Sequence, residues 1–216
     1  MSTPRKLTRC QCAPSSDSAP VRRETCHVLS KLAFMGDDKT IVALGKMIGD
    51  KDADVKSEAV KAMGVVAGCK NDLTILQVLS EKLQSRDWSE RECAANAMLL
   101  HADRGNESAV STVSALLKHQ DVYVRSTAVS LLTKLSLPCV CKVASGDQCL
   151  CKTVPLLLES THDELPVIRK AAIEALELVA NRKDKRVADR VKREMLSDKD
   201  FSVRGAVEHA IGVFLG

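Results

Sequence analysis

Apolar residues recur along the chain at the spacing of one helix face, and the same face returns six times. Each recurrence is centred on a basic residue, and we call these residues the basic column: Arg22, Lys56, Arg91, Arg125, Arg169 and Arg204. Three, six, seven and ten residues after them the side chain is nearly always small or apolar, as in Ala128, Leu131, Leu132 and Leu135. These offsets share one side of a 3.6-residue helix, so each segment is predicted to be an amphipathic helix.

The basic column also sets a period, because its members are separated by 34, 35, 34, 44 and 35 residues. Shorter apolar-periodic stretches lie between these segments, at 39–49, 71–84, 106–118, 153–161 and 184–196. The pattern therefore predicts an all-α chain of about five and a half antiparallel helical hairpins. We expect a disordered basic tail over 1–17 and a repeat domain over 18–216. Its second helices are predicted near 18–35, 53–68, 88–103, 121–136, 164–181 and 199–215.

An aspartate stands four residues before most members of the basic column, where a short carboxylate can cap a helix N-terminus. With these columns, as in the segment from Asp121 to Val129, the sequence resembles the HEAT-repeat family. That resemblance implies a right-handed α-solenoid in which the two columns form a ladder between successive repeats. Asp163 departs from the pattern, since it lies six residues before Arg169. The implied ladder residues are Asp52, Lys56, Asp87, Arg91, Asp121, Arg125, Arg169, Asp200 and Arg204.

Composition and charge narrow the class of protein. Hydrophobic residues make up 45% of the 216 residues and aromatic residues only 2%, which suits helix–helix packing better than a β-sandwich. The 32 basic and 28 acidic residues give a net charge of only +4, so a nucleic-acid partner is not expected. No apolar run reaches the ~18–20 residues of a membrane span, and no secretory signal precedes the repeats. We expect a cytoplasmic protein, with nuclear or organellar placement as the alternative.

The longest step of the period contains a cysteine-rich insertion over 137–152. Its two Cys-x-Cys pairs are Cys139, Cys141, Cys149 and Cys151. Residues two apart point to one face of an extended strand, so a small hairpin would bring four thiolates together as a structural zinc site. Loop thiols packed against helix ends, and disulfides across the hairpin, are the alternatives. No other cofactor is expected.

The second helices carry a polar stripe five residues after the basic column, and apolar residues nine after it. HEAT-type repeats mostly bind proteins, so we expect a scaffold or adaptor whose concave face binds a protein or peptide. Its expected contact residues are His27, Lys61, Val65, Asn96, Leu100, Ser130, Glu174, Leu178 and His209. For the three apolar members, packing against the adjacent helix is the alternative to partner contact.

Catalysis is not expected, because no set of titratable residues converges. Deoxyhypusine hydroxylase, a repeat enzyme, uses His-Glu pairs, whereas this chain has only the reversed Glu208-His209. A bilin-lyase-like enzyme or enzyme subunit and a nucleic-acid-binding repeat protein are the alternative functions. The apolar end of the last helix suggests either a longer array or end-to-end association through that helix.

Overall fold

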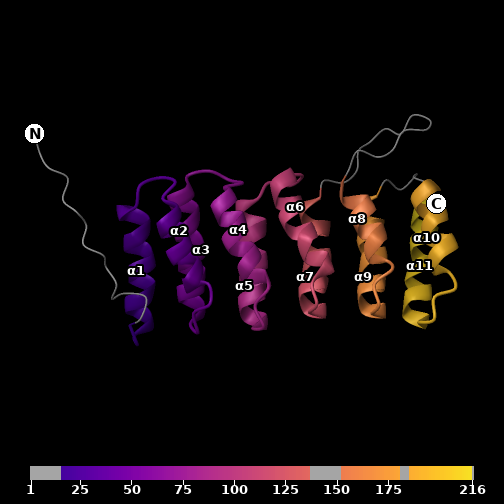
Figure 1. Ribbon diagram of the computed structural model, residues 1–216, viewed down its shortest axis with the longest axis horizontal. Helices are drawn as coiled ribbons and strands as arrows, with labels where there is room; N and C mark the ends of the chain where they lie inside the picture. Colours follow the sequence, from indigo (N-terminus) through magenta and orange to yellow (C-terminus); the bar gives the residue numbers. More distant parts are fainter. Residues whose placement is uncertain (1–15, 137–151, 181–184, 216) are drawn as a thin grey trace, which may run out of the picture. The chain divides into compact units, whose positions relative to one another are not determined.

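A computed structural model describes residues 16–136, 152–180 and 185–215. These residues contain eleven α-helices and one short 3-10 helix, and no strand. The prediction of an all-α chain of helical hairpins is confirmed. The chain divides into two compact units, residues 1–97 and 98–216, with the boundary inside one helix. Figure 1 shows the first and second helices of a hairpin side by side within each unit.

The first unit begins with a lone second helix and continues with paired helices. Its elements are α1 (Ala19–Leu32), α2 (Asp38–Met47), α3 (Ala53–Ala67), α4 (Leu73–Leu83) and the greater part of α5 (Trp88–His101). Helix α3 packs against both α1 and α2, and α2 packs against α4. The core is aliphatic, with Ile41, Leu44, Met63, Ile75 and Leu79 fully buried. Two neighbouring first helices therefore form one layer and two neighbouring second helices another.

Close approach of α2 and α4 depends on Gly45. A Cβ atom at this position would lie 2.2 Å from a methyl carbon of Val78. A methyl group at position 45 would therefore overlap the side chain of α4. The glycine lowers the helix propensity of α2 but permits this helix–helix contact.

The second unit contains three complete hairpins. Its elements are α6 (Glu107–Ser114), the 3-10 helix η1 (Ala115–Lys118), α7 (Val122–Leu135), α8 (Thr153–Ser160), α9 (Pro166–Val179), α10 (Lys185–Met195) and α11 (Phe201–Leu215). Helix α9 packs between α7 and α11, and α6, α8 and α10 pack against α7, α9 and α11 respectively. One continuous core joins the last two hairpins, with Leu157, Ile173, Leu176, Val203 and Val207 at its centre.

The helix ends follow from local sequence. The carboxylate of Asp52 accepts hydrogen bonds from the amides of Asp54 and Val55 at the start of α3, and Asp121 accepts one from Tyr123 at the start of α7. Gly68 ends α3 with a φ of 70°, in the left-handed region that favours glycine. Side-chain capping and a glycine stop therefore set the hairpin boundaries.

Candidate functional site

In the first unit, the exposed side of the second helices carries charged and apolar residues together. Lys61 is exposed, His27 is half-buried, and Asn96 is exposed on α5. Glu58 of α3 lies between the first two, with carboxylate oxygens 3.6 Å from His27 Nδ1 and 3.9 Å from Lys61 Nζ. Val65, one turn after Lys61, is 59% exposed. The structure thus places a mixed polar stripe beside an exposed aliphatic side chain.

The second unit repeats this arrangement. Leu178 on α9 is 71% exposed and Leu100 is 54% exposed, so neither finishes the packing of a helix pair. Ser130, Glu174 and His209 are exposed as well. The Nδ1 atom of His209 lies 3.1 Å from both carboxylate oxygens of Glu177, which joins α11 to α9. The predicted contact residues of this unit are therefore accessible to solvent.

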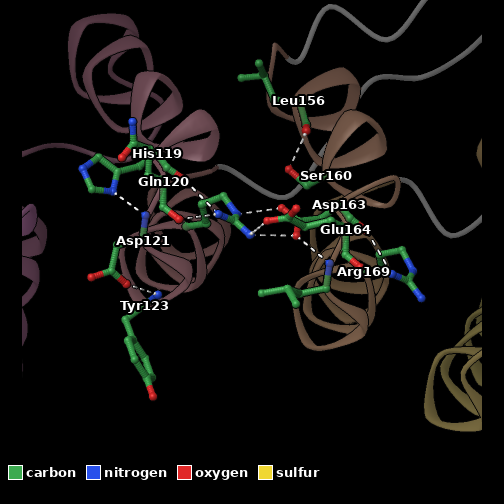
Figure 2. A network of polar contacts seen from close by, with 11 residues as sticks. His119, Gln120, Asp121, Tyr123, Leu156, Ser160, Asp163, Glu164 and Arg169 are labelled. Carbon is green, nitrogen blue, oxygen red and sulfur yellow. Dashed lines mark hydrogen bonds and ion pairs between the residues drawn. The ribbon is translucent and has the colours of Figure 1, made fainter.

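Behind this surface, buried arginines connect successive hairpins. Arg125 of α7 donates from Nε and Nη2 to the carboxylate of Asp163, at 2.8 and 3.1 Å (Figure 2). Arg169 of α9 makes the same two-pronged contact with Asp198, at 2.8 Å for both bonds. In the first unit, Arg22 pairs with Asp50 at 2.7 and 2.8 Å. A planar guanidinium can donate two parallel hydrogen bonds to one carboxylate. The contact is therefore strong and also fixes the relative orientation of the two groups.

The three aspartates occupy one position of the repeat, six residues before the basic column, and we call it the turn position. Its members are Ser16, Asp50, Ser85, His119, Asp163 and Asp198. In all six repeats the side chain here accepts a hydrogen bond from the backbone amide two residues later, at 2.9 to 3.3 Å. In the five repeats whose basic-column residue is arginine, the carbonyl of the turn position accepts from Nη1 of that arginine, as Asp163 does from Arg169 at 2.9 Å. The turn position thus fixes the start of its own second helix and, where it is aspartate, binds the preceding repeat.

This geometry corrects the ladder that the family resemblance implied. Asp52, Asp87, Asp121 and Asp200 accept backbone amides at the starts of their own helices. The carboxylates bound by the preceding arginines are instead Asp50, Asp163 and Asp198. Asp163, the apparent exception in the sequence, is therefore a regular member of the ladder. Sequence inspection missed Asp50 and Asp198 because serine or histidine replaces aspartate at this position in other repeats.

The ion pairs shift the pKa values of five of their members, Arg22, Asp50, Arg125, Arg169 and Asp198. Hydrogen bonds from Arg22 lower the pKa of Asp50, and hydrogen bonds from Arg169 lower the pKa of Asp198, in both cases against the opposing effect of burial. The pKa of Arg125 is raised, chiefly by its hydrogen bond to Asp163. All of these groups are consequently charged at neutral pH.

In the first unit, other polar contacts replace one arginine–aspartate ion pair of the ladder. Lys56, which stands where most repeats have arginine, donates from Nζ to Ser89 at 2.7 Å. Glu90, which replaces an aliphatic residue, contacts Lys82 Nζ at 2.7 Å and Ser85 Oγ at 2.5 Å. Burial alone would raise the pKa of Glu90, but these hydrogen bonds lower it. Polar contacts thus hold α4 to α5 in this repeat.

The predicted zinc ligands Cys139, Cys141, Cys149 and Cys151 lie outside the described residues. Within the described ranges, no group of three or more His, Cys, Asp and Glu side chains could hold a metal ion. Of the described cysteines, Cys26 is buried, Cys93 is partly buried and Cys69 is exposed. None of the helices that the structure describes is both long and apolar enough to cross a bilayer.

Comparisons with known proteins return likenesses of structure. No protein-family model matches the chain, and no curated protein sequence matches it. Human deoxyhypusine hydroxylase in complex with glycerol is 18% identical with a TM-score of 0.48, over 94% of this chain and 82% of that one. A designed armadillo repeat protein in complex with the peptide (KR)4 is 19% identical with a TM-score of 0.46, over 93% and 95%. An engineered protein is 18% identical with a TM-score of 0.46, over 94% of both chains. The described residues themselves form an all-α chain of helical hairpins.

Proposed function

We propose that this protein is an interaction scaffold that binds a protein or peptide on the exposed side of its second helices. The observation that carries the proposal is the exposure of Leu178, 71%, at a repeat position that contributes nothing to the core. Three other repeats have an aliphatic residue at the equivalent position: Val65 and Leu100 are more than half exposed, and Val213 is partly buried. Aliphatic side chains repeated at an exposed position are a ready source of binding free energy.

Polar groups beside these side chains support the same function. Glu174 lies one turn before Leu178, and its carboxylate is 3.6 Å from Lys170 Nζ. The exposed His209 of the neighbouring helix α11 lies 3.1 Å from the carboxylate of Glu177, a largely buried residue of α9. An apolar residue bordered by polar residues of both signs suits an amphipathic helix or an extended peptide, which presents alternating apolar and polar groups. Such mixed charge would not suit a phosphate backbone.

The test uses the full chain as bait for partner capture with chemical crosslinking. The double variant Leu100→Asp/Leu178→Asp, both within the second unit, should lose at least ten-fold of the recovered partner signal. The matched control is Leu73→Asp, because Leu73 is 68% exposed but lies on a first helix. Circular dichroism melts should show that both variants are folded. If the double variant retains every partner that the control retains, this surface is not the binding site.

A further inference from the structure

One short helix, α10, carries a net charge of +3, from five basic residues and two acids. Residues 185–193 of α10 contain five basic residues, Lys185, Arg186, Arg190, Lys192 and Arg193, and one acid, Asp189. Removing them from the 32 basic and 28 acidic residues of the chain leaves 27 of each. The entire excess of +4 therefore lies within nine residues. The balanced total, which argued against a nucleic-acid partner, conceals a local excess.

The fold places this charge on one face. Val187, Ala188, Val191 and Met195 of α10 are buried in the core of the second unit. The five basic residues and Asp189 are all exposed. The apolar side of α10 thus has its partner in α11, and the opposite side presents charge alone. At 1.5 Å per residue, the basic residues extend over about 12 Å of helix axis.

Most of this charge is available to a ligand. Arg190 pairs with Glu194 at 3.2 Å, and Glu194 also lies 3.3 Å from His162 Nε2. Within the described residues, Lys185, Lys192 and Arg193 have no ion pair. Lys192 and Arg193 line a shallow surface depression together with Asp189, Leu196 and Ser197. Asp189 is the one acid on the exposed face, and Lys185 and Arg193 lie one turn before and after it.

The other described first helices show no such excess. Helix α2 has Asp38 with Lys39 and Lys46, and α4 has Glu81 with Lys82. The charged residue of α6 is Glu107, and that of α8 is Glu159. The basic face is therefore a particular property of α10 and does not arise from the repeat pattern.

The composition of the face distinguishes among anionic partners. Every fully exposed residue of α10 is charged, so the face offers no side chain to insert into a membrane and no aromatic or aliphatic centre for a protein interface. It also lacks an aromatic residue on which a single-stranded base could stack. A ligand bound here would be recognised by regularly spaced negative charge, as along a nucleic-acid duplex.

We propose that the exposed face of α10 binds the phosphate backbone of duplex nucleic acid, independently of base sequence. Lys185, Lys192 and Arg193 would contact phosphate oxygens. This surface lies on a first helix, whereas the proposed peptide-binding residues lie on second helices. The two functions can therefore fail independently.

The test measures fluorescence anisotropy of a labelled 20-base-pair DNA duplex against the full-length chain at several salt concentrations. Three phosphate contacts predict a slope of about −2.7 for log affinity against log salt, a loss on the order of 40-fold between 50 and 200 mM. The variant Lys185→Gln/Lys192→Gln/Arg193→Gln removes all three contacts, so it should bring the slope close to zero and abolish most binding at 50 mM. The matched control Lys31→Gln/Lys39→Gln/Lys46→Gln removes the same charge from exposed positions of α1 and α2, and should bind like the original chain.

Three results would overturn the proposal. The first is no binding of the duplex at 50 mM salt. The second is an equal loss in both triple variants, since net charge rather than α10 would then be responsible. The third is binding to a poly-glutamate peptide or to phosphatidylserine vesicles that exceeds binding to the duplex, because the partner would then be an acidic protein or a membrane.

Discussion

Arg125 and Asp163 are 38 residues apart in the chain, yet their side chains form a two-pronged ion pair behind the exposed surface. Both are nearly buried, with side-chain exposures of 7% and 11%. Asp163 also accepts the amide of Leu165 at 3.0 Å, immediately before α9 begins. One carboxylate therefore orders the start of its own helix and attaches that helix to the hairpin before it.

Loss of this carboxylate should destabilise the second unit. The variant Asp163→Asn removes the carboxylate that pairs with the buried guanidinium of Arg125. We therefore expect the free energy of unfolding to fall by about 2–3 kcal/mol. Glu164 provides the matched control, since it contacts the same guanidinium at 3.2 Å but is 78% exposed. Glu164→Gln should cost less than about 0.5 kcal/mol. Urea denaturation measures both, and equal costs would show that the buried pair has no special role.

The aspartates of the ladder should make stability depend on acid pH. Because Arg22 and Arg169 lower the folded-state pKa values of Asp50 and Asp198, the unfolded chain binds protons more readily than the folded one. Their contribution is complete above the unfolded pKa of about 4, and is lost as pH falls through the folded values. The stability difference between the original chain and Asp198→Asn should therefore be constant from about pH 5 to 7 and shrink below pH 4. A difference that grows on acidification would contradict this assignment.

Cysteine reactivity should follow burial. Removal from water raises the pKa of the Cys26 thiol to about 11, and Cys26 is 0% exposed. Cys69, by contrast, is exposed. Iodoacetamide at pH 8 followed by peptide mapping should modify Cys69 readily and Cys26 only when urea unfolds the first unit. Equal labelling of the two in the folded protein would mean that α1 separates from α3.

Two glycine-to-alanine changes should act in opposite directions. Gly45→Ala inserts a methyl group against Val78 and should cost about 1–3 kcal/mol. Gly205 lies inside α11 with nothing within 4 Å of the added Cβ position. Gly205→Ala should therefore stabilise the protein by up to about 1 kcal/mol through helix propensity. Thermal melts of the two variants test both directions, and destabilisation by both would indicate an unrecognised contact at Gly205.

The fold was accessible from sequence because its determinants are local. The small or apolar residues at offsets such as those of Ala128 and Leu132 recur with one period, and a periodic pattern survives many substitutions. The face of α10 was missed for the opposite reason. The net charge of the whole chain offsets basic residues such as Arg193 against acids that lie far away. The charge on the exposed side of one helix can be counted only when the buried side of that helix is known.

The ladder shows a further limit of sequence inspection. Asp50 and Asp52 are separated by a single residue, and both are aspartates before a helix, so composition cannot assign their roles. Only the packed structure shows that Asp50 contacts Arg22 of the neighbouring repeat whereas Asp52 caps its own helix. The exposure of Leu178 likewise becomes known only when the adjacent helix is in place.

The ladder of the second unit has a direction. Arg125 bonds forward to Asp163, Asp163 bonds through its carbonyl to Arg169, and Arg169 bonds forward to Asp198. The cation of each ion pair always belongs to the earlier repeat and the anion to the later one. A truncation that removes the last hairpin therefore strands the guanidinium of Arg169, whereas a truncation from the other end that removes Arg125 strands the carboxylate of Asp163. The two cut ends of this array are chemically different, and a shortened version needs a new carboxylate at one end or a new guanidinium at the other.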